Sequence, residues 1–166
     1  MSEDVVVVDD AARFRQILGS FPTGVTVVTT LEEGHPVGMA AGSFFSVSLD
    51  PPLVGFCVMT TSNTWPLIER SGSFGVSILA DDQTAICKRL ASKAPDKFDG
   101  VPWSPSAHGS PVLDGVVAWI DGELWAEYDG GDHTIAVARV LDLGAHADRR
   151  PLLFHRGAYG LLRTEA

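Results

Sequence analysis

The stretch Val25-Thr26-Val27-Val28-Thr29-Thr30 decides the fold class, because every residue in it is β-branched. Branched side chains are stiff in a helix and pack well on a pleated sheet, so the stretch predicts a strand. The turn residues Glu32-Glu33-Gly34-His35 follow it, and a second apolar run then covers residues 37–49. Together these segments predict a β-hairpin in the first part of the chain.

Strand-like runs continue along the rest of the chain. Asp50-Pro51-Pro52 ends the second run, because proline has no N–H to give to a strand ladder, and residues 53–59 then form a short apolar strand. Further strands are predicted over residues 74–79, 116–128, 134–143 and 152–155, and the turn Asp129-Gly130-Gly131-Asp132 separates two of them. Many short strands without alternating long helices predict a mainly β, antiparallel barrel with a few short flanking helices.

Three short helices are expected beside these strands. The apolar residues of the first follow the spacing i, i+3, i+4, i+7: Phe14, Ile17, Leu18 and Phe21. Asp9-Asp10 is the expected cap of this helix, and Ser62-Asn63 is the expected cap of a second helix that begins at Trp65. Asp81-Asp82 is the expected cap of a third helix over residues 85–90.

Length and charge limit the classes of function. A chain of 166 residues is about one domain, and we expect an acidic tail over residues 1–10 followed by a single domain over residues 11–163. The net charge of −9 and the lack of basic runs make nucleic acid an unsuitable partner. The apolar run of residues 5–8 has acidic flanks, unlike a signal peptide, and no run approaches the roughly 20 residues of a membrane helix. We therefore expect a soluble, cytoplasmic protein.

Common catalytic and metal motifs are missing from the sequence. It contains no GxGxxG after a strand, no GxxxxGK[ST], no GxSxG and no HExxH. The five histidines are too scattered to predict a metal site: His35, His108, His133, His146 and His155. Cys57 and Cys87 are expected to be buried, reduced thiols. Four tryptophans are expected in the core or at an interface: Trp65, Trp103, Trp119 and Trp125.

Two polar segments each allow two interpretations. Ser43-Phe44-Phe45-Ser46-Val47-Ser48 alternates hydroxyls with apolar groups, which predicts that Ser46 and Ser48 share one face and that Phe45 and Val47 share the other. That serine face is either the polar edge of a ligand site or the wet side of a half-buried strand. Ser62-Asn63-Thr64 at a helix start is either a phosphate cradle or a plain cap.

Positive charge and one histidine also stand out. Arg89, Lys93 and Lys97 gather positive charge in an acidic chain, which indicates either a site for a phosphorylated ligand or a solvated helix end. His133 follows a glycine-rich turn and begins a strand, which indicates either a ligand contact or a hydrogen-bonded strand end. Spacing alone leaves these alternatives open.

Four stretches carry a resemblance to a known family. They are Phe21-Pro22-Thr23-Gly24-Val25-Thr26-Val27-Val28-Thr29, the segment from Gly38-Met39 to Ser43-Phe44 and on through Leu53, Ala91-Ser92-Lys93 with Asp96-Lys97-Phe98, and Gly131-Asp132-His133-Thr134-Ile135. In this order they resemble the short-chain flavin reductases of two-component monooxygenases, whose fold is the flavin-binding split barrel of Greek-key type. The resemblance runs from about residue 14 to residue 159.

The resemblance implies a function and a set of site residues. It implies an NAD(P)H-dependent flavin reductase that passes a hydride from the nicotinamide to FMN or FAD and supplies reduced flavin to a partner flavin-dependent monooxygenase. The acidic composition, which offers no patch for a ribose phosphate, favours NADH over NADPH as the donor. The resemblance also implies a homodimer. His133 is the implied catalytic residue, in contact with the nicotinamide, and no metal is implied. The implied cofactor-binding residues are Ser43, Phe44, Ser46, Ser48, Ser62, Thr64, Arg89, Lys97 and Asp132.

Several positions depart from the family pattern. The family commonly has Thr and Asn where this chain has Ala40 and Gly42, Thr where Phe45 stands, and Gly where Ala138 stands. Each lost polar contact to the flavin weakens binding by about 0.5–1.5 kcal/mol. Two alternatives to a reductase therefore stay open: a non-catalytic flavin carrier, and a split-barrel oxidoreductase that uses another flavin-like cofactor on an organic substrate.

Overall fold

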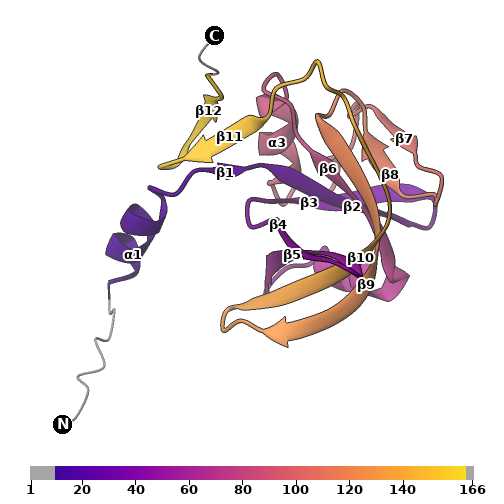
Figure 1. Ribbon diagram of the computed structural model, residues 1–166, viewed down its shortest axis with the longest axis horizontal. Helices are drawn as coiled ribbons and strands as arrows, with labels where there is room; N and C mark the ends of the chain where they lie inside the picture. The colour runs from indigo at the N-terminus through magenta and orange to yellow at the C-terminus, as the bar shows by residue number, and fades with distance from the viewer. Residues whose placement is uncertain (1–9, 164–166) are drawn as a thin grey trace.

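A computed structural model describes residues 10–163 and shows one curled antiparallel sheet with short helices around it (Figure 1). Seven strands form this sheet, in the spatial order β3 (His35–Ala41), β2 (Thr26–Glu32), β6 (Ser73–Ile78), β9 (Ala118–Asp129), β10 (His133–Ala145), β5 (Pro52–Met59) and β4 (Phe45–Leu49). Its end strands β3 and β4 are not paired with one another, so the barrel is not closed. The predicted mainly β, antiparallel fold is confirmed.

Two apolar clusters fill the molecule, one on each side of β2 and β6. In the first, the rings of Phe56, Trp65 and Phe74 pack edge to face, with centroids 5.6–6.3 Å apart. The second joins the sheet to α3 (Thr84–Leu90) and to the small sheet of β7 (Trp103–Pro105) and β8 (Pro111–Leu113). Because successive strand residues point to opposite faces, the neighbouring residues Val28 and Val27 of β2 belong to the first and the second cluster.

The apolar run of residues 37–49 is not one strand, contrary to the prediction. β3 ends at Ala41, and β4 begins at Phe45 on the other side of the barrel. The reason is a tertiary contact, since the Oγ of Ser43 both donates to the carbonyl of Cys57, at 3.1 Å, and accepts from its N–H, at 2.8 Å. Phe44 then packs against the first apolar cluster. The chain therefore crosses between sheet edges within three residues.

One of the predicted helix caps is confirmed. The Asp10 side chain accepts from the N–H of Arg13, at 2.9 Å, and begins α1 (Ala11–Leu18). Asp9, the other expected cap of this helix, lies outside the described residues. The cap predicted for the second helix is wrong, because the N-cap residue of α2 (Trp65–Ser71) is Thr64, without a side-chain capping hydrogen bond. The Ser62 hydroxyl instead accepts from the N–H groups of Thr64 and Trp65 and so holds the turn that leads into the helix.

The predicted cap of the third helix is wrong. Asp81 and Asp82 form ion pairs with Arg150 and Arg149, which come from a distant part of the chain. Gln83 is the N-cap residue, and its side chain accepts from the N–H of Ala80 and donates to the carbonyl of Asp114 instead of capping α3. Long-range partners therefore replace the local cap.

A part of the molecule that we name the arm projects from the barrel and carries both chain ends (Figure 1). It consists of α1 and a three-stranded sheet of β1 (Thr23–Gly24), β11 (Leu152–His155) and β12 (Ala158–Leu161). The N–H of Arg156 donates to the carbonyl of Gly19, at 2.9 Å, and joins the β11–β12 turn to the end of α1. Tyr159 links β12 to α3 through a 3.3 Å hydrogen bond with Cys87. Strand β12 was not predicted from the sequence.

The predicted division of the chain is not tested by the structure. Residues 1–9 of the expected tail lie outside the described range, so the division into a tail and a domain over residues 11–163 stays a prediction. Within residues 10–163 no helix is both long and apolar enough to cross a membrane.

The cysteines and tryptophans differ in burial. Cys57 is half-buried and Cys87 is buried, and both are free thiols. Trp65 is buried as expected, whereas Trp125 is 52% exposed.

Candidate functional site

A cavity of about 720 Å³ lies beside the end strand β3. Consecutive residues of β3 line it, including Met39, which belongs to the first apolar cluster, and Ala40, which belongs to the second. Because neighbouring strand residues face opposite sides, the cavity must reach around the free edge of β3. The end of β5, the loop before α2, the segment after α3 and His133 of β10 complete the lining. Four separate segments of the chain, within residues 36–43, 57–67 and 90–98 and at His133, therefore meet at this cavity.

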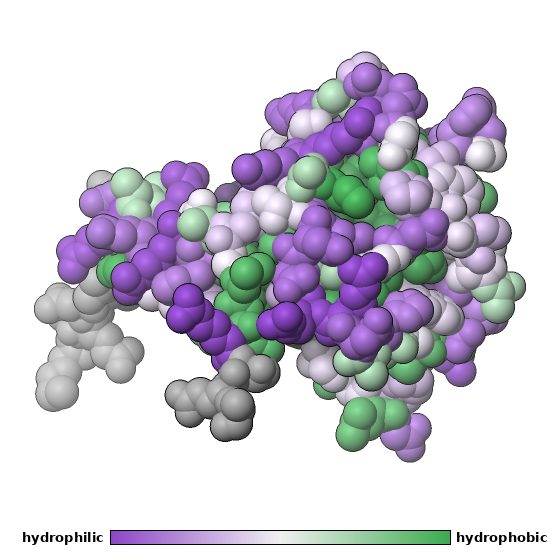
Figure 2. All heavy atoms as spheres, turned by 90° about the horizontal axis from the view of Figure 1, so that it is seen from above, coloured by the Kyte–Doolittle hydropathy of each residue, from purple (hydrophilic) through white to green (hydrophobic). Residues whose placement is uncertain are grey.

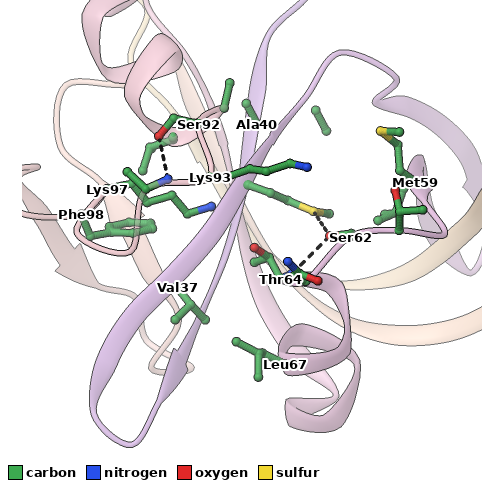
Figure 3. A pocket seen from close by; sticks show the side chains of 18 of the residues that line it. Val37, Ala40, Met59, Ser62, Thr64, Leu67, Ser92, Lys93, Lys97 and Phe98 are labelled. Carbon is green, nitrogen blue, oxygen red and sulfur yellow. Dashed lines mark hydrogen bonds between the residues drawn. The ribbon is translucent and has the colours of Figure 1, made fainter.

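The charge of the cavity differs from that of the whole chain. The sequence carries 21 acidic residues against 12 basic ones, yet among residues 10–163 no Asp or Glu lines the cavity. Lys93 and Lys97 do, and both side chains extend from the segment after α3 into the hollow, across from Ser62 and Thr64 (Figure 3). Such a local reversal of charge favours an anionic ligand.

The two lysines have no acidic partner in the described part of the chain. None of the five ion pairs there includes Lys93 or Lys97. Partial burial lowers the pKa of Lys97, because the charged ammonium is poorly solvated there. A bound anion would offset this cost.

Hydroxyl groups face the lysines across the cavity. Ser62 accepts from two N–H groups at the start of α2, as described above, and its own proton lies toward the sulfur of Met39, at 3.7 Å. The hydroxyl of Thr64 makes no hydrogen bond within residues 10–163 and is available to a ligand. Ser62 therefore shapes this wall, while Thr64 presents a free polar group.

His133 stands at the rim where β10 begins. Its Nδ1 lies 2.6 Å from Oδ1 of Asp132, and its side chain is 39% exposed. The Asp132 carbonyl accepts from the N–H of Thr60, at 3.0 Å, so the turn that carries the histidine is fixed to the end of β5. With Nδ1 engaged, Nε2 is the ring atom left for a ligand.

Comparison with known proteins identifies the family. A family model described as "Flavin reductase like domain" matches residues 18–163. This chain belongs to the flavin reductase family.

Three members of the family illustrate the similarity. The reductase subunit HsaB of a flavin-dependent monooxygenase from Rhodococcus jostii is 51% identical over 150 residues, which cover 90% of this chain and 77% of the relative. An FMN reductase (NADH) from Agrobacterium fabrum is 40% identical over 152 residues, 92% of this chain and 86% of the relative. The crystal structure of a Streptomyces globisporus NADH:FAD oxidoreductase, in complex with NAD and FAD fragments, has a TM-score of 0.90 at 36% identity and covers 95% of each chain.

The family resemblance named ten site residues, and the structure brings five of them to the cavity. These are Ser43, Ser62, Thr64, Lys97 and His133. Asp132 lies behind His133, with its own side chain 89% exposed. Lys93, Asn63, Cys57 and Met59 also line the cavity, although the resemblance did not include them. The clustering of Lys93 with Lys97 in an acidic sequence was the available signal for Lys93.

The other four named residues lie away from the cavity. Arg89 donates to the carbonyl of Asp96, at 2.9 Å, and so holds the loop that carries Lys97. Phe44 packs into the core. Ser46 and Ser48 lie in β4, where a register shift at the residue between them interrupts the alternation that predicted a shared face. A role of these residues in flavin binding stays a prediction.

Proposed function

We propose that this chain is an NADH-dependent flavin reductase that reduces FMN or FAD and supplies the reduced flavin to a separate flavin-dependent monooxygenase. The observation that carries the proposal is the cavity described above: within residues 10–163 it is lined by two lysines without an acidic partner and by no carboxylate, in a chain of net charge −9. Flavin nucleotides are phosphorylated, and such a cavity fits an anionic, mainly apolar ligand. The names of the relatives support the same activity.

The residues present fit a flavin nucleotide. Lys93 and Lys97 are suited to its phosphate, and Thr64 is suited to a neighbouring oxygen. Apolar side chains of β3, α2 and α3 line the rest, including Val37, Leu67 and Leu90, and suit a flat aromatic ring system. A volume of about 720 Å³ lies within the usual range of roughly 300–1,000 Å³ for ligand sites.

In this proposal the chain contributes to catalysis by holding the flavin and the nicotinamide in position. When bound, the flavin supplies the acceptor for the hydride of NADH, and the electronics of the reaction belong to the two cofactors. The chain needs neither a nucleophile nor a pair of carboxylates for such a transfer. His133 positions the nicotinamide through Nε2 while Asp132 fixes its ring, and the apolar walls limit access of water.

Release and assembly complete the proposal. The cavity opens to solvent at a rim where Met59 is 56% exposed, which suits a ligand that leaves after each turnover. We therefore expect reduced flavin to reach the monooxygenase by diffusion. We further expect a homodimer that works in the cytoplasm, where NADH is supplied by metabolism.

A direct assay tests the function. NADH consumption by the purified chain should rise when FMN or FAD is added, and anaerobic samples should accumulate reduced flavin in a one-to-one ratio with the NADH consumed. NADPH in place of NADH tests the choice of donor. A chain that binds flavin but consumes no NADH would be a carrier. NADH oxidation that needs an organic substrate and is indifferent to added flavin would support the other alternative.

A further inference from the structure

One carboxylate lies in the core without a partner. Asp121 of β9 is 0% exposed, and within residues 10–163 neither of its side-chain oxygens accepts a hydrogen bond or belongs to an ion pair. On the face shown in Figure 2, hydrophilic residues cover much of the surface, where water solvates them. A carboxylate in the core loses this solvation at a high cost in free energy unless another group compensates its charge.

The register of the sheet shows which residues lie beside Asp121. Gly75 of β6 pairs with Asp121 on one side and with Thr29 of β2 on the other. Residues paired across neighbouring strands lie on the same face of a sheet, with Cβ positions about 4.5–5.5 Å apart. Ile120, which precedes Asp121, belongs to the first apolar cluster, so Asp121, Gly75 and Thr29 form a row on the opposite face.

Strand β8 and the residue before it cover the middle of this row. A Cβ atom added to Gly75 would lie 2.9 Å from the carbonyl oxygen of Pro111 and 3.1 Å from Oγ1 of Thr29. It would also lie 3.2 Å from the Cβ atom of Ser110, a residue that is itself buried. Because Gly75 has no side chain, oxygen atoms of two other segments gather beside the carboxylate. We name this group the oxygen cluster; its members are Thr29, Gly75, Ser110, Pro111 and Asp121.

Acceptor atoms exceed donor hydrogens in the oxygen cluster. The Thr29 hydroxyl has a single proton, and the carbonyl oxygens of Gly75 and Pro111 are both within hydrogen-bond reach of it. Pro111 has no N–H, and the N–H of Ser110 donates to the Ser106 hydroxyl, at 3.1 Å. The two carboxylate oxygens add to this surplus. A buried surplus of oxygen acceptors with one uncompensated negative charge indicates a bound cation, because a water molecule supplies hydrogen bonds but no positive charge.

We propose that the oxygen cluster binds one alkali-metal cation, Na⁺ or K⁺, between β9 and β8. Hard cations take carboxylate, carbonyl and hydroxyl oxygens as ligands, and Asp121, Pro111 and Thr29 supply one of each. A single carboxylate balances a monovalent ion. Within residues 10–163 no three His, Cys, Asp or Glu side chains gather in the way that a tight divalent site requires.

The cation site is separate from the flavin cavity. Among the described residues, no member of the oxygen cluster lines that cavity. The ion would join the small β7–β8 sheet to the main sheet, where the Ser77 hydroxyl already accepts from the N–H of Leu113, at 3.1 Å. Its expected effect is therefore on the stability of the fold, and it is measurable without flavin or NADH.

The test compares unfolding in three salts of equal ionic strength. The wild type is unfolded with urea in sodium chloride, potassium chloride and choline chloride, and choline is too large for a buried site of this kind. Sodium or potassium should raise the urea midpoint above its value in choline. Above the dissociation constant, each tenfold increase in the bound cation should raise the ratio of folded to unfolded protein about tenfold. Equal midpoints in all three salts overturn the proposal.

Two variants separate this site from general salt effects. Asp121→Asn keeps the shape of the side chain and removes its charge, so its urea midpoint should not depend on which of the three cations is present. Glu123→Gln is the matched control, because it removes a half-exposed carboxylate on the same strand, and it should respond to the salts as the wild type does. A response that Asp121→Asn retains in full assigns the cation elsewhere and overturns the proposal.

A direct measurement on the wild type decides the question even if Asp121→Asn does not fold. Diffraction from wild-type crystals soaked in a rubidium or thallium(I) salt should show an anomalous peak beside the Asp121 carboxylate, since these ions replace K⁺ in oxygen sites. A peak only at surface carboxylates, or none at all, overturns the proposal. Flavin reduction by the same preparation is scored separately, so the loss of either conclusion leaves the other standing.

Discussion

The Nδ1 atom of His133 lies 2.6 Å from Oδ1 of Asp132, and the carbonyl of the same aspartate accepts from the N–H of Thr60 at the end of β5. One residue thus orients the imidazole through its side chain and anchors the turn through its backbone. An exposed pair of this kind adds little to stability, so its value lies in fixing the ring at the rim of the cavity.

His133→Ala should impair the use of NADH. We expect the Michaelis constant for NADH to rise about 2–10-fold, the effect of losing one hydrogen bond of about 0.5–1.5 kcal/mol, while the dissociation constant for flavin stays within twofold. Asp132→Ala should have a smaller effect in the same direction, because the imidazole is still present but less ordered. Steady-state kinetics with each substrate varied in turn measures both. Equal losses for NADH and flavin would contradict a role specific to the nicotinamide.

Lys93→Gln and Lys97→Gln should each weaken the binding of FMN. Hydrogen bonds to charged groups contribute about 1.5–3 kcal/mol, so we expect losses of roughly 10–100-fold. Riboflavin lacks the phosphate and serves as the internal control, since its affinity should not change. Arg89→Gln is the matched variant outside the cavity and should have a smaller effect. Titration by flavin fluorescence gives all these constants, and an equal loss for riboflavin would place the lysines elsewhere than at the phosphate.

The lowered pKa of Lys97 predicts how stability changes with pH. Burial lowers the pKa of the folded protein below the unfolded value, so between these two values the unfolded chain binds more protons. The ligand-free protein should therefore gain stability as pH rises through the folded pKa of Lys97, and the gain should end near the unfolded value of about 10.4. Comparing urea unfolding of the wild type and of Lys97→Met across this range isolates the effect. The same rise in both proteins would assign it to another group.

Restoring the polar residues typical of the family should strengthen flavin binding. Ala40 and Gly42 line the cavity, and a Cβ atom on Gly42 meets only the Thr23 hydroxyl, at 3.4 Å, so a side chain can begin at Gly42 without a close contact. The room at Gly42 is shown by this contact alone, so we expect Gly42→Asn to raise flavin affinity about 2–10-fold, whereas Ala40→Thr adds bulk to a residue that packs against the second apolar cluster and should raise affinity less. Phe45 departs from the family as well but lies on the outer face of the sheet, so Phe45→Thr should leave flavin affinity unchanged. A loss of affinity in Gly42→Asn would show that the position is needed free of a side chain.

Ser43→Ala should lower the free energy of unfolding, whatever its effect on flavin reduction. The hydroxyl satisfies both the N–H and the carbonyl of Cys57, and its loss leaves these partly buried groups without a partner. We expect the free energy of unfolding to fall by about 1–3 kcal/mol. Ser43→Thr keeps the hydroxyl and is the control. Chemical unfolding measures the free energy of unfolding of both variants. Equal values would contradict the prediction and would show that water replaces the hydroxyl at Cys57.

Local patterns in the sequence were enough to predict most of the fold. The β-branched run of residues 25–30 and the apolar run of residues 53–59 form β2 and β5, because their strand preference agrees with their place in the core. A polar turn at Ser62 before the second helix was also predictable, since the partners of its hydroxyl are two and three residues away, although the cap residue itself is Thr64. These features depend on neighbours in sequence.

The predictions that were wrong concern residues whose hydrogen-bond or ion-pair partners are distant in the sequence. The run of residues 37–49 is broken because Ser43 bonds with Cys57, and Asp82 does not cap α3 because Arg149 pairs with it. In the candidate site, the sequence pointed to Lys97 and His133, and the structure places both at the cavity. It could not separate Lys93 from Arg89, since the path of the loop after α3 decides which of these two side chains turns inward.

The unpaired edge of β3 has a consequence for how the cavity is built. A closed barrel would fill this position with another strand, whereas here the position beside the end strand belongs to the cavity. A flavin bound there, as proposed above, would contact segments that no ladder of backbone hydrogen bonds joins to β3. We therefore expect amide hydrogen exchange in these segments to slow when flavin is added.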